Sequence, residues 1–309
     1  MYDVCVVGAG PAGLGAGMYA GRLNLRTLIV GEDAGGLIAT TTLVENYPGF
    51  VSISGTELAG RLLEHARHYG VELVEERVEE IRKVCNGFEV VTGSGRYQAK
   101  SVILATGTAH RKLPAKNADR FEGRGVYYCA LCDAPLLRDR RAAVVGGGDG
   151  AAKEALLVAE YAEKVYILCR DEGLHAEPPN LRKVEENPRI EIINHTNVVE
   201  IAGDDVVRGV VMERHGRTER LEVDGVFVAI GGVPRSELAV KLGVEVNEKG
   251  EVVTDKKGRT SMPGVFAAGD VTSGGFRQAI ISVAEGVSAA YSAYRYLTSE
   301  YVETRRCEP

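Results

Sequence analysis

The 309-residue sequence has no tryptophan, only 10 prolines, and no apolar run of the roughly 20 residues that a membrane-spanning helix needs. Hydrophobic residues make up 45% of it, which excludes wholesale disorder. The net charge is −6, and no basic stripe of the kind that nucleic-acid-binding proteins carry is present. The composition therefore predicts a globular protein whose partners include neither nucleic acid nor a membrane.

Basic residues are missing ahead of the first apolar segment, which carries Asp3 and several glycines. A secretory signal is therefore not expected, and a cytoplasmic location is predicted. Six cysteines in a chain of this length do not make a disulfide framework. The length exceeds what one compact core normally holds, so two domains are predicted.

Glycine is abundant instead, with 38 residues or about 12% of the chain, against about 7% in an average protein. Two clusters stand out, at residues 8–17 and 146–150. Each follows a short β-branched run and precedes a helix rich in small residues. The predicted strands are 3–7, 27–30, 143–145 and 165–168, and the predicted helices are 14–24 and 151–163.

The two segments superpose when Gly8 is placed on Gly146, and the same shift aligns Glu32 with Arg170. The chain therefore carries two copies of one strand–turn–helix–strand unit. This repeat predicts an α/β fold with two doubly wound, Rossmann-like nucleotide-binding domains.

The first cluster reads Gly8-Ala9-Gly10-Pro11-Ala12-Gly13, a G-x-G-x-x-G. In such a turn the second glycine lets the backbone approach a pyrophosphate, which the free N–H groups of the helix N-terminus then bind. Glu32 follows the second predicted strand of this unit, where a carboxylate can accept hydrogen bonds from ribose hydroxyls. The alternative is a structural turn without a ligand.

The second cluster is a G-x-G-x-x-A, formed by Gly146, Gly148, Asp149, Gly150 and Ala151. Its second strand is followed by Arg170 rather than by an acid, and an arginine there favours the 2′-phosphate of NADPH. The next residue is Asp171, which would repel that phosphate. The sequence thus leaves the choice between NADPH and NADH open.

Cys129-Ala130-Leu131-Cys132 is followed by Asp133. This C-x-x-C spacing suits a redox-active disulfide at a helix start, with Asp133 as a proton donor and acceptor. The alternative is half of a zinc site, but Cys5, Cys85, Cys169 and Cys307 are isolated and supply no second pair. No metal is expected.

These motifs and several others make the chain resemble the low-molecular-weight thioredoxin reductases over nearly its whole length. The further segments are Gly35-Gly36 with residues 40–42 and 44–49, Ala105-Thr106-Gly107, Gly264 to Asp270, and Arg277-Gln278-Ala279. The resemblance implies FAD contacts by Gly8, Gly10, Pro11, Ala12, Gly13, Glu32, Gly36, Leu37, Asn46, Ala105, Thr106, Gly107, Gly269, Asp270, Arg277, Gln278 and Ala279.

The resemblance also implies a discontinuous FAD domain, residues 1–111 and 240–309, with residues 112–239 inserted as the pyridine-nucleotide domain that carries the cysteine pair. Electrons would pass from a nicotinamide to the flavin, then to the Cys129–Cys132 disulfide, and then to a thioredoxin or glutaredoxin-like protein. By analogy Cys132 faces the flavin, Cys129 attacks the partner, and Asp133 handles the proton. A homodimer is expected from the family.

The chain departs from the family pattern in three segments. Asp171 and His175 stand where arginines for NADPH are usual, so NADH or a ferredoxin-type donor stays open, with His175 as a partial substitute. Leu37 replaces a common glutamine, and Ala134-Pro135 follows Asp133. The rival hypotheses are a dithiol oxidase or ferredoxin-linked disulfide reductase of the same fold, and a non-enzymatic flavin sensor, which would leave the cysteine pair unexplained.

Overall fold

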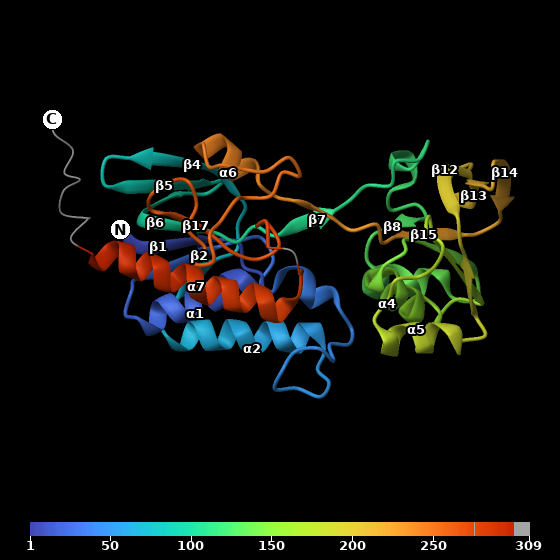
Figure 1. Cartoon of the computed structure of the whole chain (residues 1–309), viewed down its shortest axis with the longest axis horizontal. Coiled ribbons are helices and arrows are strands. Elements are labelled where there is room, and N and C mark those ends of the chain that lie inside the picture. Colours follow the sequence, from blue (N-terminus) through green and yellow to red (C-terminus); the bar gives the residue numbers. More distant parts are fainter. Residues whose placement is uncertain (275, 300–309) are drawn as a thin grey trace. The chain divides into compact units, whose positions relative to one another are not determined.

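The protein, as a computed structural model, is described over residues 1–274 and 276–299. The chain divides into two compact units (Figure 1). The first comprises Met1–Ala109 and Pro234–Pro309, and the second comprises His110–Val233. The second unit is thus inserted into the chain of the first. The limits expected from the resemblance, after residues 111 and 239, lie a few residues further along the chain. Each unit is described separately.

The first unit is built on one seven-stranded sheet. Its parallel strands are β3 (Glu72–Val74), β2 (Thr27–Val30), β1 (Tyr2–Val7), β6 (Arg96–Leu104) and β17 (Val265–Ala267). An antiparallel hairpin, β4 (Val78–Val84) and β5 (Gly87–Thr92), joins the N-terminal half of β6, while β17 pairs with its C-terminal half. The carboxyl ends of β1 and β2 therefore lie side by side, where an α/β sheet binds its ligand.

Both faces of this sheet are covered, which explains why β1 and β2 read as continuous apolar runs. Val4 and Val6 pack into a core with α1 (Pro11–Arg22), α2 (Gly55–His68) and α7 (Ala279–Thr298), which lie together on one face (Figure 1). Cys5 and Val7 point the other way, into a core with the β4–β5 hairpin and α6 (Glu237–Leu242).

Small residues let α1 and α7 pack closely. A Cβ on Gly15 would lie 2.9 Å from the Val283 carbonyl oxygen, and one on Gly286 would lie 2.1 Å from the Ala12 carbonyl oxygen. The close packing fixes the start of the C-terminal helix beside the first turn of α1. Segments from opposite ends of the chain therefore meet at the first glycine loop.

The second unit has a five-stranded parallel sheet, ordered β11 (Ile190–Ile193), β10 (Lys164–Leu168), β9 (Arg141–Val145), β15 (Gly225–Val228) and β8 (Val126–Tyr127). On one face lie α3 (Ala130–Asp133), η3 (Ala134–Leu137), α4 (Asp149–Val158) and α5 (Pro178–Glu185). On the other lies an antiparallel sheet of β12 (Thr196–Gly203), β13 (Val207–Arg214) and β14 (Arg217–Leu221).

Short elements complete the chain. They are η1 (Gly36–Thr40), η2 (Asp119–Phe121) and the two-stranded pair β7 (Thr108–His110) and β16 (Gly232–Pro234). This pair stands at the two points where the chain passes between the units.

The internal repeat is confirmed by strand register. Val4 pairs with Thr27 in the first unit, and Ala142 pairs with Val165 in the second. The same shift that places Gly8 on Gly146 also places Val4 on Ala142 and Thr27 on Val165. The order β3-β2-β1-β6 likewise corresponds to β11-β10-β9-β15. One supersecondary unit therefore builds both domains.

Several boundaries predicted from the sequence were wrong. The helix predicted at 14–24 begins at Pro11, because proline suits the first helical turn, and the helix predicted at 151–163 ends at Val158. β6 includes residues 96–100, whose alternating exposed and buried side chains a search for apolar runs misses. A search for apolar runs also misses β12, which is only partly buried, and β14, which is almost wholly exposed.

Candidate functional site

The first glycine loop connects β1 to α1. Gly8 has φ +113°, and a Cβ there would lie 2.1 Å from the Ala105 carbonyl oxygen. A Cβ on Gly13 would lie 1.9 Å from the Gly8 carbonyl oxygen. Packing within the protein therefore requires glycine at both positions, and Ala105 is placed against the loop.

Gly10 is different, because a Cβ there would meet no atom closer than 4.0 Å. It precedes Pro11 and Ala12 in the first turn of α1, whose N-terminus has no side-chain cap. Gly36, in the left-handed region at φ +59°, lies against the Gly10 backbone. The loop thus keeps open space before a helix N-terminus, which fits a pyrophosphate such as that of FAD.

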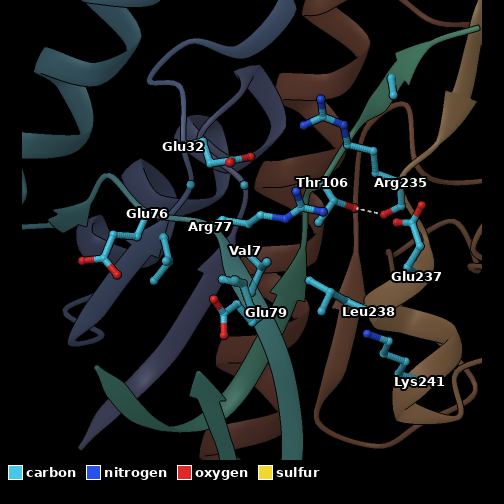
Figure 2. A pocket seen from close by; sticks show the side chains of 15 residues that line it. Val7, Glu32, Glu76, Arg77, Glu79, Thr106, Arg235, Glu237, Leu238 and Lys241 are labelled. Carbon is cyan, nitrogen blue, oxygen red and sulfur yellow. Dashed lines mark hydrogen bonds between the residues drawn. The ribbon is translucent and has the colours of Figure 1, made fainter. Parts of the chain in front are cut away.

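A cavity of about 580 Å³ opens at the carboxyl ends of β1 and β2 (Figure 2). Glu32, which follows β2, lines it together with Gly8 and Thr106. Further residues on its wall were not singled out from the sequence. They are Val7, Val30, Gly31, Glu76, Arg77, Val78, Glu79, Ala109, Arg235, Glu237, Leu238 and Lys241.

Thr106 and Gly107 are fixed by the returning chain. The Thr106 hydroxyl donates a hydrogen bond to the Arg235 carbonyl oxygen at 2.6 Å, and the Arg235 amide donates to the Gly107 carbonyl oxygen at 2.9 Å (Figure 2 shows the first). Their backbone therefore forms a fixed edge of the cavity, and the Thr106 hydroxyl is already engaged.

The segment expected beside the flavin ring is brought together from both ends of the chain. The Asn46 amide nitrogen donates to the Gln278 side-chain oxygen at 3.0 Å, and Gln278 directly precedes Ala279, the first residue of α7. The Arg277 guanidinium pairs with Glu251 at 2.7 Å. Leu37, which lies in η1 with 42% of its surface exposed, supplies an apolar side chain at its position.

Glu285 places a second carboxylate near Asp270. The Ser282 hydroxyl donates to Asp270 at 3.1 Å, and the Gly269 amide donates to Glu285 at 2.8 Å. Burial raises the pKa of Glu285, the Gly269 hydrogen bond opposes that rise, and the charge of Asp270 adds to it. Glu285 was missed from the sequence, because only the packing of α7 places it here.

The cysteine pair lies in the second unit. Cys129 and Cys132 form a disulfide, with Cα atoms 5.4 Å apart. Cys129 caps the N-terminus of α3, and its sulfur accepts a hydrogen bond from the Cys132 amide at 3.2 Å. An amide aimed at sulfur stabilises a thiolate, so Cys129 is the better placed of the two to act as one.

Two carboxyl groups flank the pair. Asp133 ends α3 and is partly buried, and burial raises its pKa. Glu154 of α4 accepts a hydrogen bond from the Ala130 amide at 2.7 Å. Burial raises the pKa of Glu154 as well, the Ala130 amide opposes this, and the charge of Asp133 adds to it. Glu154 was not singled out from the sequence.

The second glycine loop has the same construction as the first. Gly146 has φ +155°, and a Cβ there would lie 2.3 Å from the Ala229 carbonyl oxygen and 3.0 Å from Ala151. Around Gly148 and Gly150 a Cβ would meet nothing within 4 Å. The loop therefore also leaves room before a helix N-terminus, that of α4, and fits a second dinucleotide.

Asp149 and His175 are held at this loop. Burial would raise the pKa of Asp149, but hydrogen bonds from Asn180, Lys153 and the Glu177 amide bring it below its ordinary value. The carboxylate is thus satisfied by the protein. The His175 amide donates to the Gly147 carbonyl oxygen at 2.7 Å, which places His175 beside the glycines.

Arg170 is exposed after β10 and lies 3.7 Å from Asp171, with Glu172 exposed next to them. A carboxylate that close lessens the attraction of Arg170 for a phosphate dianion. The geometry therefore supports the reservation about NADPH that the sequence raised.

Within residues 1–274 and 276–299, no group of three or more His, Cys, Asp and Glu side chains could hold a metal ion. No helix of that part of the chain is long and apolar enough to cross a membrane. Cys5 and Cys169 are buried free thiols, and burial raises their pKa values to about 12 and about 11. Cys307 lies outside the described residues.

Two dinucleotide folds, one of them carrying a redox disulfide, define the class as a flavin- and nicotinamide-type disulfide oxidoreductase. Residues 2–286 match the model of the family described as "pyridine nucleotide-disulphide oxidoreductase". The chain belongs to this family.

Named relatives and solved structures agree with that membership. The chain is 40% identical over 300 residues to a thioredoxin reductase of Treponema pallidum, covering 96% of this chain and 97% of the relative. It superposes on the Lactococcus lactis thioredoxin reductase with a TM-score of 0.93 and 35% identity, over 96% of this chain and 99% of that one.

A ferredoxin-flavin thioredoxin reductase from Clostridium acetobutylicum is also similar, at 34% identity and a TM-score of 0.52. The match covers 96% of this chain and 98% of that one.

Proposed function

We propose that this protein is an FAD-dependent thioredoxin-disulfide reductase, which takes electrons from NAD(P)H and delivers them through the Cys129–Cys132 disulfide to a thioredoxin-like protein. The observation that carries the proposal is the disulfide at the N-terminus of α3, within a unit that also has a dinucleotide loop. Membership of the family and the named relatives support it. When bound, FAD would supply the two-electron redox chemistry that links the nicotinamide to the disulfide.

The chain's own residues act on the sulfur chemistry. An electron pair and one proton convert the Cys129–Cys132 disulfide into one thiolate and one thiol. The Cys132 amide favours the thiolate on Cys129. Cys129 then attacks a sulfur of the partner disulfide, a mixed disulfide forms, and the leaving sulfur takes a proton from Asp133. The Cys132 thiol returns a proton to Asp133 and its sulfur attacks Cys129, which re-forms the Cys129–Cys132 disulfide and releases the second partner sulfur as a thiolate. Burial raises the pKa of Asp133, which helps it hold that proton.

The FAD assignment rests on the first unit. The residues that would hold the cofactor are the glycine loop, Glu32, the Thr106–Gly107 edge and Asp270. Gly8, Glu32 and Thr106 line one cavity, and Asp270 is held by the Ser282 hydroxyl of α7. The pyridine nucleotide would lie against Gly146, Gly148 and Gly150 in the second unit. Homodimer assembly and a cytoplasmic location, expected from the sequence, remain predictions.

Two specific observations favour a second candidate for the electron donor. Arg170 is paired with Asp171, and the similar protein from Clostridium acetobutylicum is named a ferredoxin-flavin reductase. We infer that NADH serves better than NADPH, with a ferredoxin-linked reductase as the alternative. A dithiol oxidase or a flavin sensor is favoured by no observation on the described residues.

The test is anaerobic reduction of the purified holoenzyme, followed by its flavin absorbance. NADH is expected to bleach the flavin at lower concentration than NADPH, because Asp171 repels the 2′-phosphate. Bleaching by reduced ferredoxin alone would replace the nicotinamide donor with the second candidate. Bleaching by a reduced thioredoxin, with none by nicotinamides or ferredoxin, would reverse the direction of electron flow and support the oxidase.

A further inference from the structure

Glu154 lies directly beneath the redox helix. It belongs to α4, and its carboxylate accepts the hydrogen bond of the Ala130 amide at 2.7 Å. Ala130 stands between the two cysteines, and only 1% of its surface is exposed. The first N–H groups of a helix have no partner within it, so this carboxylate satisfies a buried donor in the C-x-x-C turn itself.

One charged neighbour shifts the pKa of Glu154. Asp133 of α3 is the charged group whose field acts on it. The charges of Asp133 and of Arg140, which precedes β9, act in opposite directions on the pKa of Tyr127 in β8. Two carboxyl groups therefore flank the cysteine pair, and burial raises the pKa of each.

We propose that Glu154 is a positioning residue for thiol–disulfide exchange, which holds the first turn of α3 through the Ala130 amide and whose negative charge acts on Cys129 and Asp133. This inference rests on the proposed function, because it concerns the same cysteine pair. It adds a second carboxylate to a site in which sequence reasoning found only Asp133.

The charge of Glu154 should shift the pKa values of its neighbours in one direction. A nearby negative charge disfavours ionisation, so it raises the pKa of a thiol or a carboxyl. Removing the charge of Glu154 should make the Cys129 thiol ionise at lower pH. The Asp133 carboxyl should respond in the same direction.

Three substitutions separate the charge from the hydrogen bond. Glu154→Gln keeps an oxygen that can accept from Ala130 and removes the charge. Glu154→Asp keeps the charge and withdraws it from the amide. Glu160→Gln is the control, because Glu160 is exposed just beyond α4 and carries the same charge in the same unit.

The experiment measures alkylation of Cys129 in holoenzyme reduced with dithiothreitol. Short pulses of iodoacetamide across a pH series are followed by peptide mass spectrometry, and amide hydrogen exchange at Ala130 is measured on the same samples. Glu154→Gln is expected to move the Cys129 profile down by about half to one pH unit, which is roughly three- to tenfold more thiolate below the midpoint. Glu154→Asp should leave that profile near the wild type and speed Ala130 exchange, and Glu160→Gln should change neither.

Coincident profiles for Glu154→Gln and Glu160→Gln would overturn the electrostatic role. If Glu154→Gln does not fold, a Cys129 profile displaced downward in Glu154→Asp would overturn it instead, since that variant retains the charge. Unchanged Ala130 exchange in Glu154→Asp would overturn the positioning role. Dithiothreitol supplies the electrons and no partner protein is present, so failure of the proposed donor or substrate leaves this result unaffected.

Discussion

Alanine substitutions at the glycine loops separate the two cofactor sites. At Gly10 the backbone is extended, with φ −76°, and the nearest atom to a Cβ is 4.0 Å away. Glycine-to-alanine changes at such positions stabilise a fold by roughly 0.4–1 kcal/mol through the unfolded chain. Gly10→Ala should therefore leave the apoprotein at least as stable as the wild type.

Binding of FAD by Gly10→Ala should be impaired, because the methyl group fills the space that the pyrophosphate approaches. Loss of one hydrogen bond to a charged group costs about 1.5–3 kcal/mol. At about 1.4 kcal/mol per factor of ten, the dissociation constant should rise by about 10- to 150-fold. Flavin fluorescence during titration of apoprotein measures this, and thermal unfolding of the same apoprotein measures stability.

Gly148→Ala is the matched variant in the second unit, where a Cβ meets nothing within 4 Å. It should retain FAD and raise the KM for the pyridine nucleotide by a similar factor. Gly8→Ala is the opposite control, since its Cβ would lie 2.1 Å from a backbone oxygen, and it should destabilise the apoprotein. The reasoning is refuted if Gly10→Ala binds FAD as the wild type does, or if Gly148→Ala loses FAD and keeps its nucleotide KM.

Three further outcomes are expected. Asp133→Asn should slow reduction of a protein disulfide by roughly 100-fold and leave flavin reduction by the donor unchanged; it should also remove the fall in rate that the wild type shows as pH rises through the raised pKa of Asp133. Burial raises the pKa of Glu285, so the stability that this carboxyl contributes is present below its ordinary pKa and is lost as pH rises through the folded-state pKa. Glu285→Gln should flatten the resulting fall of the unfolding temperature with pH, and an equal fall in the variant would contradict the assignment. Asp171→Asn should improve the KM for NADPH relative to NADH by about fivefold, from about 1 kcal/mol of repulsion at about 4 Å in water; an unchanged ratio in steady-state kinetics would place the 2′-phosphate elsewhere.

Much of the fold was predictable because it depends on local patterns. A β-branched run, a glycine turn and a small-residue helix occur at Gly8 and again at Gly146, and the strand register repeats with the same shift. The spacing of Cys129 and Cys132 likewise identifies the pair from one short stretch of sequence. These signals need no knowledge of tertiary structure.

Other residues could not be found in this way. Arg77 and Arg235 reach the cavity from a loop after β3 and from the returning chain, which only the packed sheet brings together. Arg77 follows two glutamates and precedes two more after Val78, a charge run that is typical of a solvated face. Glu154 and Glu285 lie on helices whose sequences read as ordinary, and each becomes notable because its carboxylate meets a distant backbone amide.

The central claim is that electrons leave the protein through the sulfur of Cys129. Its most direct test uses the Cys132→Ser variant, reduced and then mixed with a thioredoxin whose attacking cysteine is activated as a mixed disulfide with thionitrobenzoate. The account predicts a stable covalent complex, with mass spectrometry placing the bridge at Cys129, while Cys129→Ser forms none. A Cys132→Ser variant that forms no complex, or one joined through another cysteine, would contradict the account.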